Sequence, residues 1–187
     1  LLLSPMDAVY SFDVTMTRNE LLSPVVAQLQ GQASQADWPK IVSITGALQG
    51  AGQYPLGAAS TVSDLLSLVG GDDFFNLDVD LQIGLVVRRK DSLFQVEAVP
   101  FNLGNALNDP ASPDNLRLQA LDEVYVFNQV ASDNSNRLAL MQRVNNQFKR
   151  QAVKDEPPQV VTIDGRVRIP GEYPILATKN LTYLIDL

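Results

Sequence analysis

The chain contains no cysteine and no histidine among its 187 residues. Without cysteine it has no disulfide, no thiolate nucleophile and no cysteine-based metal site. Without histidine it lacks the commonest general base and metal ligand, so Ser-His-Asp and Cys-His devices are excluded and most zinc sites become implausible. Paired carboxylates of the glycosidase type are formally possible, but no spacing of Asp and Glu supports them. We therefore expect a non-enzymatic protein with no catalytic residue, no metal and no cofactor.

Positive charge and long apolar runs are also scarce. Fourteen Lys and Arg stand against 21 Asp and Glu, which gives a net charge of −7 and a pI near 4.5. Nucleic-acid-binding proteins usually carry a basic face, so no nucleic-acid partner is expected. No stretch reaches the roughly 18 apolar residues that a membrane-spanning helix needs. A length of 187 residues allows one or two small domains, and a hydrophobic content of 45% is ordinary for a globular protein with a core.

What the sequence does contain is a repeat with a spacing of 119 residues. Residues 39–56 read PKIVSITGALQGAGQYPL, and residues 158–175 read PQVVTIDGRVRIPGEYPI, without a gap. The same spacing holds upstream, where the recurring residues are Arg18, Leu21, Val25, Gln28, Gln32 and Ala33, matched by Arg137, Leu140, Val144, Gln147, Gln151 and Ala152. A match of this length marks a duplicated module.

The residue pattern predicts an α+β fold. Apolar residues at helical spacing predict a helix over 17–33, with Thr17 and Glu20 as a capping box. Pro24 lies inside this segment, so the helix either kinks there or begins with Ser23 as its cap. The other predicted elements are a hairpin of strands 40–48 and 53–56, a helix from Thr61, a hairpin of strands 81–88 and 93–99, a short helix over 101–107, and strands over 115–118 and 122–127.

These elements divide the chain into five segments. They are the closing strand of a preceding unit (1–16), a linker helix (17–36), a complete domain (37–128), a second linker helix (129–157) and the N-terminal half of a second domain (158–187). Both ends of the chain fall within the repeating pattern, so we expect a piece of a longer protein.

Residues 7–12 resemble residues 122–127, which makes them the homologue of a closing strand. The half domain at 158–187 has no such strand of its own, and an unpaired sheet edge is a template for pairing. Strand 7–12 is therefore predicted to pair with the 158–187 sheet, within one molecule or by exchange between two.

The strongest local motif is G-x(5)-G-x-Y-P. Its residues are Gly46, Gly52, Tyr54 and Pro55 in the first copy, and Gly165, Pro170, Gly171, Tyr173 and Pro174 in the second. Glycine relieves backbone crowding, the tyrosine is expected to pack on a helix, and proline ends the strand, so a mainly structural role is predicted. Direct ligand contact by Tyr54 or Tyr173 is the alternative.

The repeated V-x-I-x-G and G-x-Y-P hairpin, with the capped helix and Gly70-Gly71 that follow it, resembles the SLBB domain. This is the soluble-ligand-binding β-grasp module of Wza-type outer-membrane polysaccharide export proteins. The segments NLGNAL (102–107) and NLRLQ (115–119) extend the resemblance over nearly the whole chain. The second copy fits better, because the first has Ala51 where proline is usual.

The resemblance implies a tandem β-grasp fold with a truncated second copy and a periplasmic location at the outer membrane. It also implies ring-like homo-oligomers, with polysaccharide and an inner-membrane polysaccharide co-polymerase as partners. SLBB modules occur in vitamin-binding and DNA-uptake proteins too, so the fold leaves the cargo open.

Arg88, Arg89 and Lys90 form a basic run at the predicted tip of the second hairpin. Arginine forks suit carboxylates, so this run is a candidate contact for an acidic sugar or a neighbouring subunit. A solubilising turn is the alternative.

Two functions remain open at this stage. The first is a module of a capsule or exopolysaccharide export protein, acting in assembly and in contact with sugar. The second is a carbohydrate- or small-ligand-binding β-grasp module that is not tied to export.

Overall fold

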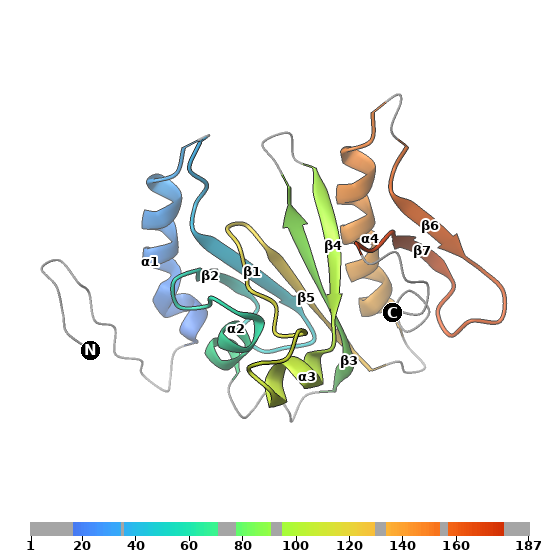
Figure 1. Cartoon of the computed structure of the whole chain (residues 1–187), viewed down its shortest axis with the longest axis horizontal. Helices are drawn as coiled ribbons and strands as arrows, with labels where there is room; N and C mark the ends of the chain where they lie inside the picture. Colours follow the sequence, from blue (N-terminus) through green and yellow to red (C-terminus); the bar gives the residue numbers. More distant parts are fainter. Residues whose placement is uncertain are drawn as a thin grey trace, which may run out of the picture.

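The computed structural model describes residues 17–34, 36–70, 78–90, 95–129, 134–153 and 157–177. These residues form a mixed α+β fold, with four helices, a five-stranded sheet and a separate two-stranded hairpin (Figure 1). The helices are α1 (Arg18–Gly31), α2 (Val62–Val69), α3 (Leu103–Asn108) and α4 (Ser135–Arg150). The strands are β1 (Ile41–Gly46), β2 (Gly52–Pro55), β3 (Val79–Arg89), β4 (Val96–Phe101), β5 (Glu123–Asn128), β6 (Val160–Ile163) and β7 (Gly171–Pro174).

The five-stranded sheet has the order β2-β1-β5-β3-β4. Strands β1 and β5 are parallel neighbours, and every other pair in the sheet is antiparallel. Gly46 ends β1 beside β5 with a φ of +126°, and a side chain there would run into the Val126 carbonyl. Glycine is required at this position because both the backbone conformation and the space exclude a Cβ atom. The parallel pair places β5, the last strand of the unit, at the centre of the sheet.

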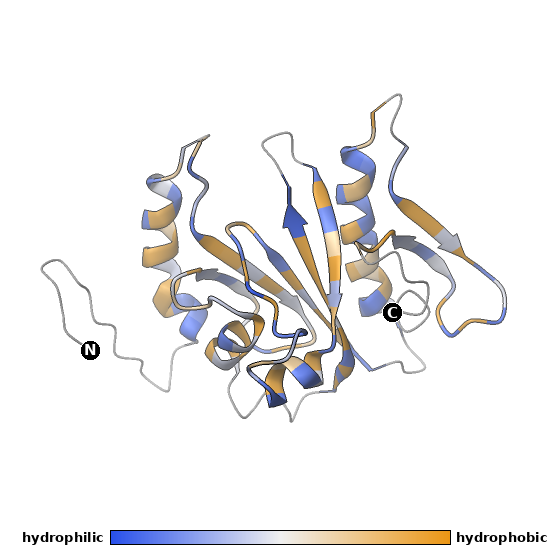
Figure 2. Ribbon diagram, viewed as in Figure 1, coloured by the Kyte–Doolittle hydropathy of each residue, from blue (hydrophilic) through white to orange (hydrophobic). Residues whose placement is uncertain are grey.

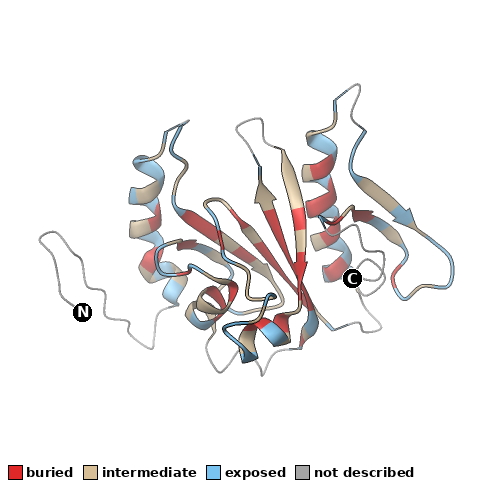
Figure 3. Cartoon of the chain, viewed as in Figure 1, coloured by how far each residue is buried: buried red, intermediate tan, exposed pale blue. Residues whose placement is uncertain are grey.

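Both faces of this sheet are covered by core residues, and Figure 3 shows buried residues along its strands. Alternate residues of β5 point to opposite faces. Val124 and Val126 lie on the inner face, whose core includes residues of α1, α2 and α3. Tyr125 and Phe127 lie on the outer face, whose core includes residues of α4 and of the β6–β7 hairpin. Helix α4 therefore lies between the sheet and the hairpin that follows it.

Helix α1 begins where the capping box predicts. The Thr17 hydroxyl accepts from the Glu20 backbone N–H, and the Glu20 carboxylate accepts from the Thr17 N–H. The helix continues through Pro24 to Gly31, so the alternative start at Ser23 is wrong. Pro24 is exposed at the surface of α1. Its ring thus displaces no core residue, and the cap at Thr17 keeps the helix start upstream.

The predicted strand over 115–118 is wrong. Only Arg117 forms an isolated bridge, to Thr61. Two backbone bonds make this bridge, Val62 N–H to Leu116 O and Leu118 N–H to Ser60 O. Side chains hold the preceding residues, because Asp114 accepts from the Asn102 backbone and Asn115 accepts from the Ser63 backbone. Such side-chain bonds give the backbone an alternative to a ladder. The short helix also starts later than predicted, since Phe101 is the last residue of β4.

The helix–hairpin unit α4–β6–β7 shares several contacts with α1–β1–β2, 119 residues earlier. Ile41 pairs with Pro55 and Val42 with Tyr54, as Val160 pairs with Pro174 and Val161 with Tyr173. The tyrosine hydroxyls donate to backbone carbonyls four residues upstream, Tyr54 to Gly50 at 2.5 Å and Tyr173 to Ile169 at 2.6 Å. A helix side chain also contacts the middle of the second strand in each unit, through the pairs Gln30–Gln53 and Lys149–Glu172.

The second hairpin lies beside the edge strand of the five-stranded sheet. Leu176 bridges Ala98 of β4 in parallel, and the Ala177 N–H donates to the Ala98 carbonyl at 2.8 Å. The predicted strand 7–12 lies outside the described residues, so its pairing stays a prediction. Among the helices of the described residues, none is long and apolar enough to cross a membrane. Figure 2 shows apolar residues along the sheet and polar ones on the outward sides of α1 and α4.

Candidate functional site

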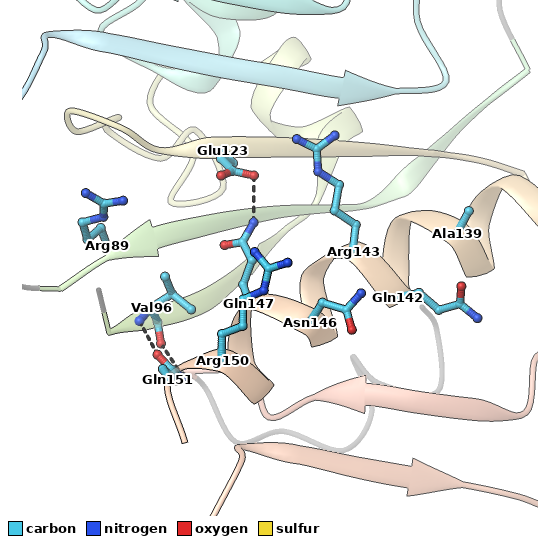
Figure 4. A pocket seen from close by; sticks show the side chains of 10 residues that line it. All are labelled: Arg89, Val96, Glu123, Ala139, Gln142, Arg143, Asn146, Gln147, Arg150 and Gln151. Carbon is cyan, nitrogen blue, oxygen red and sulfur yellow. Dashed lines mark hydrogen bonds between the residues drawn. The ribbon is translucent and has the colours of Figure 1, made fainter. Parts of the chain in front are cut away.

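A cleft of about 960 Å3 lies between α4 and the outer face of the sheet. Helix α4 forms one wall, and residues of β3, β4 and β5 form the other (Figure 4). Its lining is dominated by guanidinium and amide groups, from Arg89, Arg143, Arg150, Gln142, Asn146, Gln147 and Gln151, with Val96, Glu123 and Ala139 completing it. The cleft is thus an arginine-rich site in a chain of net charge −7.

Glu123 is the carboxylate that lines this cleft, and its Oε2 atom is already engaged. That oxygen accepts from the Tyr125 hydroxyl at 2.7 Å and from Gln147 Nε2 at 2.9 Å. Figure 4 shows Gln147 reaching from α4 to Glu123, and Arg143 pointing from α4 towards the strand that carries Glu123. Three guanidinium groups and one carboxylate therefore line the cleft, so its lining carries more positive than negative side chains.

A hydrogen bond joins the two walls of the cleft at one end. Gln151, just beyond α4, accepts from the Val96 N–H at 2.6 Å and so ties the end of the helix to β4. Burial raises the pKa of Tyr125 above its ordinary value, and the nearby Glu123 raises it further, while Arg143 acts in the opposite direction. The Tyr125 hydroxyl therefore stays protonated and remains a donor to Glu123 at neutral pH.

An aromatic side chain adjoins the cleft. The guanidinium of Arg89 lies over the Trp38 ring, 5.4 Å from its centroid, which is the geometry of a cation–π contact. Trp38 is half-buried and also lines a smaller hollow of about 410 Å3 with Lys40 and Ala120. An aromatic face next to guanidinium and amide groups can bind a ligand that has an apolar face, hydroxyls and a negative charge.

The cleft face of α4 differs from the same face of α1. On α4 this face carries Ala139, Gln142, Arg143, Asn146 and Arg150. The residues 119 positions earlier on α1 are Glu20, Ser23, Pro24, Ala27 and Gly31. The helices keep the same contacts to their own hairpins, so the shared fold does not require the arginines and amides of α4. Their presence on one helix alone points to a role specific to this cleft.

The basic run 88–90 is divided by the structure. Arg88 lies in β3, not at a hairpin tip, and forms an ion pair with Asp122 at 2.8 Å, so its assignment to a solvated turn is wrong. Contact of Arg88 with a ligand or a neighbouring subunit stays a prediction. Arg89, the last residue of β3, lines the cleft. Lys90 forms an ion pair with Glu97 at 3.2 Å and lies at the rim of a neighbouring hollow.

The motif residues lie away from the cleft. Tyr54 and Tyr173 are buried against their own helix–hairpin units, and burial raises the pKa of both, although Arg18 and Arg137 oppose this shift. Pro55 and Pro174 are the last residues of β2 and β7. The backbones of Gly46 and Gly165 have positive φ, Gly52 packs against Asn19, Gly171 begins β7, and Pro170 is exposed just before it.

Sequence reasoning missed Arg143, Arg150, Trp38 and the amides of α4 as site residues. The repeat itself held the signal, because Arg143 replaces Pro24 and Arg150 replaces Gly31 at matched positions. Among the described residues there is no group of three or more acidic side chains placed to hold a metal ion. A comparison with protein-family models finds no match, and neither does a search of curated proteins.

Proposed function

We propose that this chain is a non-enzymatic module of a polysaccharide export protein and that its arginine-lined cleft contacts an acidic polysaccharide. The observation that carries the proposal is the cleft, with three guanidinium groups and four side-chain amides around one engaged carboxylate. Arginine binds carboxylates through paired hydrogen bonds, and side-chain amides bind hydroxyl groups as donors and acceptors.

The strand order supports a β-grasp fold of the SLBB type for residues 37–128. The order β2-β1-β5-β3-β4, with parallel central strands β1 and β5, follows from two hairpins and a crossover that contains α2. The matched contacts of the two helix–hairpin units support a tandem repeat whose unit is a linker helix and a β-grasp domain. In this proposal residues 1–16 close a preceding unit, 17–36 and 129–157 are linkers, and 158–187 begin a second domain.

The remaining parts of the proposal follow from the resemblance to SLBB export proteins. The parent protein lies in the periplasm at the outer membrane, assembles as a homo-oligomer and works with an inner-membrane polysaccharide co-polymerase. The chain's role is to line and assemble an export conduit without changing the polymer chemically.

The cleft is tested by titration with a trimer of uronic acid, followed by NMR or calorimetry at low salt. We expect a weak complex, with a Kd on the order of 1 mM, because the site is open and few groups are fully desolvated. The double variant Arg143→Gln/Arg150→Gln should weaken binding by about thirtyfold or more, since each lost charge-assisted bond contributes about 1 kcal/mol or more. Arg168→Gln is the matched control, because it removes an exposed arginine far from the cleft lining.

Three outcomes would count against the sugar proposal. Equal binding of a neutral trisaccharide would mean that the arginines do not select the ligand. Equal affinity for inorganic phosphate would reduce the site to a general anion site. Tighter binding of an acidic peptide would assign the cleft to a protein partner.

Export is tested separately, in cells that lack the gene for the parent protein. Loss of surface polysaccharide, with polymer retained inside the cell, is the expected result, and restoration by the wild-type gene completes the test. Unchanged surface polysaccharide together with oligouronate binding would favour the second function, a carbohydrate-binding β-grasp module not tied to export.

A further inference from the structure

Helix α4 contacts the outer face of the sheet through four residues, and α1 carries closely similar residues at the matching positions. Val144 and Phe148 belong to the outer-face core and are buried to 0% and 1% exposure. Gln147 donates to Glu123, and Gln151 bonds both the N–H and the carbonyl of Val96. Val144, Gln147, Phe148 and Gln151 are therefore the residues that fasten α4 to a β-grasp sheet.

On α1 the equivalent positions hold Val25, Gln28, Leu29 and Gln32. Three are identical to their α4 counterparts, and the fourth replaces one large apolar side chain by another. Their surroundings differ, since Val25 and Leu29 are only partly buried and both glutamines are exposed. Within the described residues, neither glutamine side chain has a hydrogen bond. This set of four is called the docking face of α1 below.

The docking face is not the part of α1 that packs most closely on the β1–β2 hairpin. Helix α1 packs on β2 through Leu22 and Val26, which are buried, just as α4 packs on β7 through Met141 and Asn145. The docking face adjoins these residues on the helix surface and extends away from them towards Gln28 and Gln32. Arg18 is not part of it, because its guanidinium donates to the Ser67 and Leu68 carbonyls at the end of α2.

We propose that the docking face of α1 binds the outer sheet face of a further copy of this module. The occupant offers what Glu123, Tyr125 and Val96 offer to α4: a carboxylate with a tyrosine for Gln28, an apolar surface for Val25 and Leu29, and a strand backbone for Gln32. The sheet described above cannot be that occupant in the same chain, because α4 already covers it. Each linker helix then joins two modules, one on either side, and a string of modules grows in one direction.

This inference deepens the proposed function by naming an assembly partner, but it rests on a separate set of residues from the cleft arginines. It also needs no sugar. Failure of oligouronate binding would therefore leave it standing, and failure of docking would leave the cleft proposal standing.

The test is a tandem protein in which residues 38–135 precede residues 17–177, so that α1 follows the first sheet in the register that α4 has in the chain. The natural chain has no cysteine, so a single introduced thiol reports without background. Val25→Cys should react with a thiol reagent at least tenfold more slowly in the tandem than in the single chain. Ala27→Cys, on the exposed side of α1, should react equally fast in both.

Two further measurements make the outcome decisive. Val144→Cys in the single chain sets the rate expected for a fully docked helix. Adding Gln28→Glu and Leu29→Asp to the Val25→Cys tandem should restore fast labelling, because the acid groups repel the Glu123 of the first sheet and cannot be buried unpaired. Fast labelling of Val25→Cys in the unmodified tandem, whether the first sheet folds or not, would overturn the proposal.

Discussion

The guanidinium of Arg88 and the carboxylate of Asp122 form a two-point ion pair inside the protein, with Nε donating to Oδ1 at 3.1 Å and Nη2 to Oδ2 at 2.8 Å. The Asp122 side chain is fully buried, and its Oδ2 atom also accepts from the Gln119 N–H. Arg88 Nη2 donates in addition to the Arg117 carbonyl. The pair thus ties the end of β3 to the loop that enters β5.

Removing Arg88 should destabilise the protein strongly. Arg88→Ala leaves the Asp122 carboxylate buried without its partner, and breaking such a pair costs about 3–5 kcal/mol. Urea unfolding followed by circular dichroism measures this loss. Lys90→Ala is the control, because its ion pair with Glu97 is exposed and is worth at most about 1 kcal/mol. Equal losses in the two variants would contradict the buried pair.

Stability should fall above about pH 10, where tyrosine begins to ionise. Burial raises the pKa of Tyr54, Tyr125 and Tyr173, so the folded state keeps these protons after the unfolded state has lost them. Their contribution is complete below the ordinary tyrosine pKa, and it declines with rising pH by about 1.4 kcal/mol per pH unit for each group. Urea midpoints between pH 7 and 11 test this, and Tyr125→Phe should make the decline shallower.

Three glycine substitutions should differ in cost. Gly46→Ala meets both a positive φ and the Val126 carbonyl, so it should cost more than about 2 kcal/mol. Gly165→Ala keeps a positive φ in open space and should cost about 1 kcal/mol. Gly31→Ala, in α1 with open space around it, should stabilise by up to about 1 kcal/mol. Thermal unfolding ranks the three, and a different order would refute the backbone argument.

Truncating equivalent positions of the two long helices should give unequal losses. Phe148→Ala opens a cavity in the outer-face core and should cost about 3–5 kcal/mol. Leu29→Ala removes a side chain that is only partly buried, so about 1–2 kcal/mol is expected. Urea unfolding of the single chain measures both. In the tandem protein with a docked α1, the cost of Leu29→Ala should rise.

Local features of the fold were predictable because short-range chemistry determines them. Capping boxes at Thr17 and Thr61 start α1 and α2 as expected, and the repeated glycine–tyrosine–proline hairpins form at the predicted places. The strand expected over 115–118 failed because Asp114 and Asn115 bond distant backbone groups. These partners lie far away in the sequence, so local residue propensities could not predict them and indicated a strand.

The site was less predictable for the same reason. Arg88 and Arg89 are neighbours in sequence, yet they point to opposite sides of β3, one to a buried carboxylate and the other to the cleft. Arg143 and Arg150 look like ordinary surface residues of a helix until α4 is placed on the sheet. In the sequence, only the comparison with the residues 119 positions earlier distinguishes these two arginines, since their counterparts Pro24 and Gly31 carry no charge.

The sequence by itself determined the 119-residue spacing of matching residues, the capping boxes at Thr17 and Thr61, the two glycine–tyrosine–proline hairpins and the absence of cysteine and histidine, because each depends on residue identity or on contacts a few positions apart. The tertiary structure decided which faces meet. Docking of α4 on the outer face buries Val144 and Phe148 and brings three arginines into one cleft with Glu123, whereas the matching residues of α1 are partly buried or exposed. These outcomes depend on contacts between residues far apart in the chain, where burial of apolar area and pairing of charge select one arrangement.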